Sequence, residues 1–162
     1  KLCADLENIE HIKWLRIHTR LPVVLPARIN NSLLSWMKNS RFRITMVIHA
    51  NHANEIGDEE KIALLKLQDA NITLLNQSVL LKHINDNAAV LINLSQRLHD
   101  CGVMPYYLHL LDQVQGGLHF DVDREKACKI IDNMRAKLPG YLIPRLVIEE
   151  KGECSKTAIS HI

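Results

Sequence analysis

Short apolar runs alternate along the chain with longer stretches in which apolar residues recur at helical spacing. The runs are rich in aliphatic, β-branched and aromatic residues, which is typical of buried parallel strands. They lie at residues 14–20, 44–49, 72–81 and 105–111. The helical stretches lie at residues 2–11, 32–39, 58–70, 88–101 and 123–138. Since a helical stretch follows each of the four runs, the pattern predicts an α/β fold whose parallel strands are joined by right-handed crossovers.

Prolines limit two further segments. Residues 21–29 contain Pro22 and Pro26, and neither proline fits a helix interior or a central strand, so we expect a shaped loop there. Residues 141–148 read as extended, but Pro144 argues against a central strand in that segment. The four clear strands are too few to close a barrel by themselves.

The composition argues against several classes of protein. Hydrophobic residues make up 47% of the 162 positions, charged residues 23%, and the formal net charge is +2, so nothing favours nucleic acid or an anionic membrane as a partner. No apolar run reaches the roughly 18 residues of a membrane-spanning helix. The chain opens without a signal peptide and without an initiator methionine, so we expect a segment of a longer, cytoplasmic protein.

Four cysteines are scattered along the chain, and none lies within four residues of another. This spacing argues against a zinc site and against a compact disulfide framework. We expect unpaired, partly buried thiols in a reducing compartment. The cysteines are Cys3, Cys101, Cys128 and Cys154.

Polar side chains gather where the predicted strands end. Asp112 follows the run at 105–111, and paired glycines and His119 come soon after it. Residues 50–56 follow another run; among them, His52 is a metal ligand by residue type, but it has no partner at a recognised spacing. Because α/β folds build their active sites at the carboxyl ends of parallel strands, we expect a site at this edge of the sheet.

Several stretches resemble, in the same order, segments of the lysine 2,3-aminomutase family of radical S-adenosylmethionine (SAM) enzymes. They are RIHTRLPVVLPARI at 16–29, HANHANEI at 49–56, NQSVLLKHIND at 76–86, MPYYLHLLDQVQGGLHF at 104–120, GYLIP at 140–144 and GECSKT at 152–157. The resemblance covers nearly the whole chain. His109, the sequence DQVQGGLHF and the short tail look most like the bacterial branch that makes (R)-β-lysine for translation elongation factor P.

The resemblance implies a partial (β/α)6, TIM-like barrel of the radical SAM type. This chain matches only its C-terminal four β/α units, within residues 1–148, followed by a C-terminal segment at 149–162 that carries the lysine for pyridoxal 5′-phosphate (PLP). The family's cluster motif, CxxxCxxC, is absent, so we expect no metal ligands in this chain and a [4Fe–4S] cluster held by a missing N-terminal half. We therefore expect this chain alone to be inactive and not to cleave SAM.

The activity that the resemblance implies is that of an isomerase. Such an enzyme converts L-lysine to β-lysine by PLP-assisted 1,2-migration of the amino group, started by a radical from SAM. Two alternatives stay open: a non-catalytic fragment or binding module without the iron–sulfur half, and a simpler barrel enzyme such as an aldolase. A partial barrel also exposes strand edges, so pairing with another copy is expected to be possible.

The resemblance assigns the substrate side of the site to three residues. Lys156 matches the lysine that forms the Schiff base with PLP, whereas without the resemblance it reads as a solvated tail lysine. Asp112 and Glu149 match the acids that bind the ε-ammonium of L-lysine, because a buried cation needs paired anions. The structural alternatives are a turn cap for Asp112 and a surface charge for Glu149.

The remaining candidates are cofactor ligands. His49 and Gln77 match positions near SAM, and their side chains can bond its polar groups. Arg16 and Arg20 lie at a strand end and could hold a phosphate or carboxylate in bidentate fashion, or form structural ion pairs instead.

Overall fold

The computed structural model describes residues 2–112, 116–150 and 152–160, and all of its strands lie in one six-stranded sheet. The strand order follows the chain; β1 to β5 pair in parallel, and β6 pairs antiparallel with β5. The strands are β1 Trp14–Thr19, β2 Arg43–His49, β3 Thr73–Val79, β4 Val103–His109, β5 Arg145–Ile148 and β6 Thr157–Ala158. The expected α/β class is confirmed. Residues 113–115 of the stretch at 104–120 lie outside the described residues.

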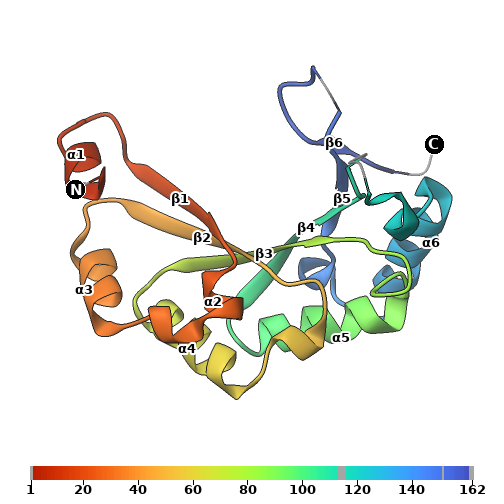
Figure 1. Ribbon diagram of the computed structural model, residues 1–162, viewed down its shortest axis with the longest axis horizontal. Coiled ribbons are helices and arrows are strands. Elements are labelled where there is room, and N and C mark those ends of the chain that lie inside the picture. Colours follow the sequence, from red (N-terminus) through yellow and green to blue (C-terminus); the bar gives the residue numbers. More distant parts are fainter. Residues whose placement is uncertain (1, 113–115, 151, 161–162) are drawn as a thin grey trace.

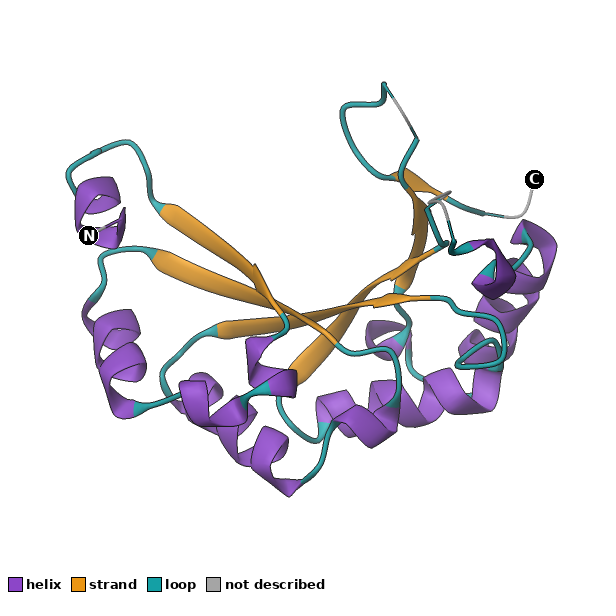
Figure 2. Ribbon diagram, viewed as in Figure 1, coloured by secondary structure: helices purple, strands orange, loops and turns teal. Residues whose placement is uncertain are grey.

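The helices lie against one side of this sheet. Figure 1 shows α3, α4 and α5 along the convex side of the curved sheet, with α6 beyond them. The concave side stays open between β1 and the β5–β6 hairpin, as the strands in Figure 2 show. The helices are α1 Leu2–Glu7, α2 Leu21–Val24, α3 Asn31–Asn39, α4 Asp58–Asp69, α5 Ala88–His99 and α6 Arg124–Arg135, with short 3-10 turns η1 Pro26–Arg28, η2 Ala53–Glu55, η3 Leu118–Phe120 and η4 Gly140–Leu142.

A single hydrophobic core fills the space between the sheet and the helices. Alternate residues of β2 point into it, because successive side chains of a strand lie on opposite faces; Ile44, Met46 and Ile48 are all buried. Leu94 and Leu98 of α5 belong to the same core. No helix in the described part of the chain is long and apolar enough to cross a membrane.

The loop expected at residues 21–29 is wrong. The segment forms two short helical turns, α2 and η1, and each begins at or beside a proline, Pro22 and Pro26. Proline lacks only an N–H group that the first turn of a helix leaves unpaired in any case, so it starts a helix as readily as it breaks one.

The expectation for residues 141–148 is also wrong in part. Strand β5 lies inside the sheet, between β4 and β6, and Pro144 stands just before it rather than within it. The proline therefore removes no N–H group from the strand, and Arg145, Leu146 and Val147 of β5 pair with β4. Strand β6 was not expected at all, since two residues carry no readable alternation.

One irregularity shapes the concave side of the sheet. Between β3 and β4 the register shifts, so that Pro105 pairs with Asn76 and Tyr107 pairs with Gln77. Tyr106 is the extra residue of this β-bulge. A bulge re-aims side chains, and here the rings of Tyr106 and Tyr107 lie together, 3.8 Å between centroids.

Candidate active site

A cavity of about 450 Å³ lies where β1, β4 and the C-terminal segment meet. Arg16 and His18 of β1 line it, together with Tyr106 and Tyr107 of the bulge and residues from 149 to 156. The Tyr106 hydroxyl donates to that of Tyr107 over 3.0 Å, and this bond, with burial, raises the pKa of Tyr106. Tyr106 and Tyr107 therefore form one wall of the cavity, called the aromatic wall below, and a hydrogen bond joins their hydroxyl groups.

Lys156 lies in this cavity, just before β6. Its Nζ forms a hydrogen-bonded ion pair with Glu149 and lies 5.9 Å from the ring centroid of Tyr107, within the range of a cation–π contact. The side chain is 26% exposed. The hydrogen bond from Lys156 and its charge lower the pKa of Glu149, so this carboxyl group is charged at neutral pH. The structure thus brings together Lys156 and Glu149, from the two arms of the β5–β6 hairpin.

His49 and Gln77 lie side by side at the ends of β2 and β3, in the same register row as Tyr107. Nε2 of His49 and Oε1 of Gln77 are buried and have no hydrogen-bond partner in the described part of the chain. Buried polar atoms are almost always paired, with protein, water or ligand. These two atoms are therefore available to a ligand on the concave side.

The cavity and this row are electrostatically connected through histidines. The rings of His18 and His49 meet edge to face, 6.2 Å apart. Burial, helped by the charges of Arg16 and Lys156, lowers the pKa of His18. Burial, helped by His18 and Arg20, likewise lowers the pKa of His49. Both rings are thus neutral around pH 7, and each keeps one nitrogen able to accept a hydrogen bond.

Asp112 follows the end of β4 and is exposed. Among the described residues it has neither a hydrogen bond nor an ion pair, so the structure shows no contact with Glu149. Both carboxylates, however, act on the same group, because each raises the pKa of His109 against the larger effect of burial. The charges of both acids that the resemblance pairs therefore act on His109.

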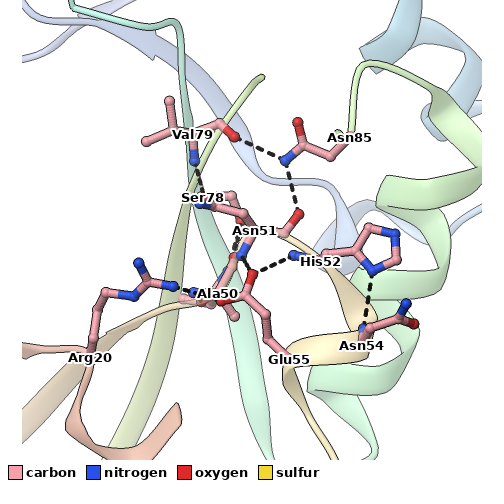
Figure 3. Close-up of polar contacts among 10 residues, drawn as sticks. Arg20, Ala50, Asn51, His52, Asn54, Glu55, Ser78, Val79 and Asn85 are labelled. Atoms are coloured by element: carbon pink, nitrogen blue, oxygen red, sulfur yellow. Dashed lines mark hydrogen bonds and ion pairs between the residues drawn. The ribbon is translucent and has the colours of Figure 1, made fainter. Parts of the chain in front are cut away.

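The two arginines have separate environments. Arg16 lines the cavity, and its charge lowers the pKa of His18. Arg20 instead forms an ion pair with Glu55 over 2.7 Å, which is the structural alternative for this residue. Oε1 of Glu55 accepts from the backbone N–H groups of Asn51 and His52, so the ion pair belongs to the loop after β2, as Figure 3 shows.

Buried amides hold this loop at the ends of β2 and β3. Asn76 bonds both the N–H and the C=O of Ala50, over 2.9 and 3.1 Å, and Asn85 donates to the carbonyls of Asn51 and Val79. Many polar side chains that follow the strands thus form hydrogen bonds with backbone groups of the loop and are not available to a ligand. Part of this network is visible in Figure 3.

His52 has a structural role of the same kind. Its Nδ1 accepts from the Asn54 N–H over 3.1 Å and caps η2. Nowhere in residues 2–112, 116–150 and 152–160 do three metal-ligating side chains come together.

Comparison with known proteins adds the missing context. No family model matches the chain. The chain is 51% identical to L-lysine 2,3-aminomutase of Escherichia coli K12 over 158 aligned residues. The alignment covers 98% of this chain and 46% of the relative. The enzyme of the same name from Buchnera aphidicola is 48% identical over 96% of this chain, and that from Methanococcus maripaludis 37% over 98%. The chain is homologous to the L-lysine 2,3-aminomutases over nearly its whole length.

The chain spans about half the length of the lysine 2,3-aminomutases that it matches. The two small cofactors expected from the resemblance fit the residues present. The cavity offers a primary amine at Lys156 and a guanidinium at Arg16 for PLP, and the unpaired atoms of His49 and Gln77 suit the polar groups of SAM.

The residues do not fit an iron–sulfur cluster. Such a cluster needs several converging thiolates. Cys101 and Cys128 are buried in the hydrophobic core, whereas Cys154 is exposed in the C-terminal segment. The iron–sulfur cluster that the resemblance implies therefore does not fit these cysteines.

Reasoning from the sequence missed four residues that the structure places beside the expected site: His18, Tyr106, Tyr107 and His109. A signal for the first was present, because His18 stands two positions after Arg16 on a predicted strand and therefore shares its face. The tyrosines gave no such signal, since a bulge cannot be read from alternation.

Proposed function

We propose that this chain is part of a lysine 2,3-aminomutase that converts L-lysine to β-lysine with PLP and SAM. In this proposal residues 1–148 form the C-terminal part of a radical SAM partial barrel, and residues 149–162 form the segment that carries the PLP lysine. The observation that supports it most is the position of Lys156, in a cavity between Glu149 and an aromatic wall, in a chain 51% identical to an enzyme of that name.

The reaction is an isomerisation. An amino group moves from C2 to C3 of lysine and a hydrogen moves the other way, so no oxidant or reductant is consumed. When bound, PLP supplies an electrophilic carbonyl with a conjugated ring, and SAM supplies the precursor of a radical. Everything else that the reaction needs is positioning, charge balance and exclusion of water.

The residues of this chain divide these tasks. Lys156 presents a primary amine to the carbonyl, and Arg16 supplies the positive charge for a phosphate. His49 and Gln77 bond SAM through the two buried atoms that have no hydrogen-bond partner among the described residues. Arg20 is a positioning residue and does not bind a cofactor itself, because its ion pair with Glu55 fixes the loop after β2.

Asp112 and Glu149 bind the distal ammonium of lysine in this proposal. Two carboxylates are suited to one cation that leaves bulk water. The β-lysine product would serve the modification of translation elongation factor P, which is the role of the bacterial branch that the chain resembles.

The first prediction concerns Lys156. After incubation with PLP and reduction with borohydride, mass spectrometry should find the added group on the Lys156 peptide, because this amine lines the cavity. Lys156→Ala should lose the modification, while Lys129→Ala, which removes an exposed lysine of α6, should keep it.

Labelling of another lysine at the same level, or undiminished labelling in the Lys156→Ala chain, would contradict the proposal. Such a result would favour the alternative of a non-catalytic fragment or binding module.

A further inference from the structure

His109 is a buried histidine with an unused nitrogen. The residue is 8% exposed, and its Nε2 is buried without a hydrogen-bond partner in the described part of the chain. Leaving such an atom unpaired is costly, so native structures rarely do it without a ligand or a water to take the bond. Nothing proposed so far uses this atom.

The position of His109 points to the concave side of the sheet. It is the last residue of β4, in register with Val79 of β3 and Val147 of β5. It stands two residues after Tyr107, and residues two apart on a strand share a face. The two rings meet edge to face at 5.7 Å, so His109 lies directly beyond the aromatic wall of the cavity.

Charged groups of the candidate site act on His109. After burial, which lowers its pKa, the charge of Lys156 lowers it further, while Glu149 and Asp112 raise it and His49 lowers it. The groups that act on it thus come from β2, from the C-terminal segment and from the segment after β4. The net result is a neutral imidazole, which has one nitrogen free to accept.

We propose, resting on the proposed function, that His109 is a third substrate-binding group, whose Nε2 accepts a hydrogen bond from the distal ammonium of lysine. An alkylammonium has three N–H donors, and Asp112 and Glu149 together provide for two of them. A neutral acceptor completes the set without adding a second excess negative charge. The imidazole must then carry its proton on Nδ1.

This arrangement makes His109 a specificity residue. An amino acid of the same length without the ammonium would leave Nε2 of His109 and the Asp112 carboxylate without that partner, while Glu149 would keep its ion pair with Lys156. Sites built to hydrogen-bond a polar substrate group reject the analogue that lacks it far more strongly than apolar pockets reject a size change.

The test compares binding of L-lysine and L-norleucine, which lacks the ammonium, by calorimetry on the PLP-free chain. The unmodified chain should prefer lysine by about tenfold or more. His109→Leu should weaken lysine binding about tenfold and leave norleucine within about twofold, and His109→Gln should recover part of the loss. The control His11→Leu changes an exposed histidine that precedes β1 and should behave as the unmodified chain.

A second measurement does not depend on the folding of a variant. In the unmodified chain, the 15N resonance of His109 Nε2 should shift on addition of lysine and stay in place with norleucine. An unchanged resonance, equal binding of the two amino acids, or full lysine affinity in His109→Leu would overturn the assignment. Since PLP is absent, these outcomes are independent of the labelling of Lys156, which alone tests the proposed function.

Discussion

At the scale of single residues, the concave side of the sheet is defined by histidines that burial keeps neutral. His18, His49 and His109 each have a pKa below the ordinary value, with burial as the largest cause. A neutral ring can accept a hydrogen bond, whereas a protonated ring cannot. The same property makes the folded state sensitive to acid.

We expect the free energy of unfolding to fall as the pH drops below about 6.5, the ordinary histidine value. Because the folded pKa values lie lower, the unfolded chain binds more protons in this window, and stability present above pH 6.5 is lost towards the folded values. Urea unfolding measured between pH 7.5 and 5.5 checks this. The carboxyl groups of Glu149 and Asp86, whose pKa values are lowered, act only at more acidic pH.

His109→Leu should reduce this loss, since it removes one of the three shifted groups. An identical pH dependence in the variant and the unmodified chain would show that His109 does not contribute.

At the scale of elements, the ends of β2 and β3 are joined by a side chain rather than by the ladder alone. Asn76, only 2% exposed, bonds both backbone groups of Ala50 and also donates to Ser78. Since His49 and Gln77 stand at these strand ends, the amide fixes the row that carries their unpaired atoms.

Asn76→Leu should therefore lower the free energy of unfolding by about 2–4 kcal/mol, because the Ala50 N–H stays buried without a partner. The matched control is Asn87→Ala, which removes the N-cap of α5 and should cost about 1 kcal/mol. Denaturant titration measures both. A cost for Asn76→Leu no greater than that of the cap would contradict this account.

The elements that could be predicted from the sequence are those with a regular pattern of apolar residues. The four long strands were placed within one or two residues, since β2 and its neighbours are continuous apolar runs. The prediction of a loop at residues 21–29 failed because Pro22 and Pro26 were taken to exclude a helix, whereas a proline can also begin a helical turn. The ion pair of Arg20 with Glu55 joins residues 35 positions apart and leaves no trace in local pattern. The roles of Lys156 and Glu149 came from the resemblance alone, and their ion pair with each other was not predicted.

At the scale of the whole molecule, the sheet has a free edge at β1. Among the residues that the structure describes, this strand pairs only with β2, and alternate residues of a parallel edge strand direct their N–H and C=O groups away from the sheet. Trp14 on this strand is 76% exposed. Long edges with large apolar side chains are sites of pairing with other chains.

We expect the chain to self-associate through β1, so that its average mass in sedimentation velocity rises with concentration. Trp14→Lys should reduce the association, because a charge on an edge strand opposes pairing. Tyr141→Lys, which replaces an exposed aromatic residue of η4, is the control and should change nothing. A chain that is monomeric at every concentration would refute the expectation.

The bulge in β4 also bears on how this sheet tolerates change in length. Pairing on either side of Tyr106 is regular: Pro105 lies opposite Asn76, and Tyr107 lies opposite Gln77. Deletion of the single codon for Tyr106 would therefore leave both flanking registers, and the facing of His109, as they are, while half of the aromatic wall disappears. The cavity could therefore be reshaped by deletion of one residue here. In a regular strand, the same deletion would shift the pairing register and turn the following side chains to the wrong face of the sheet.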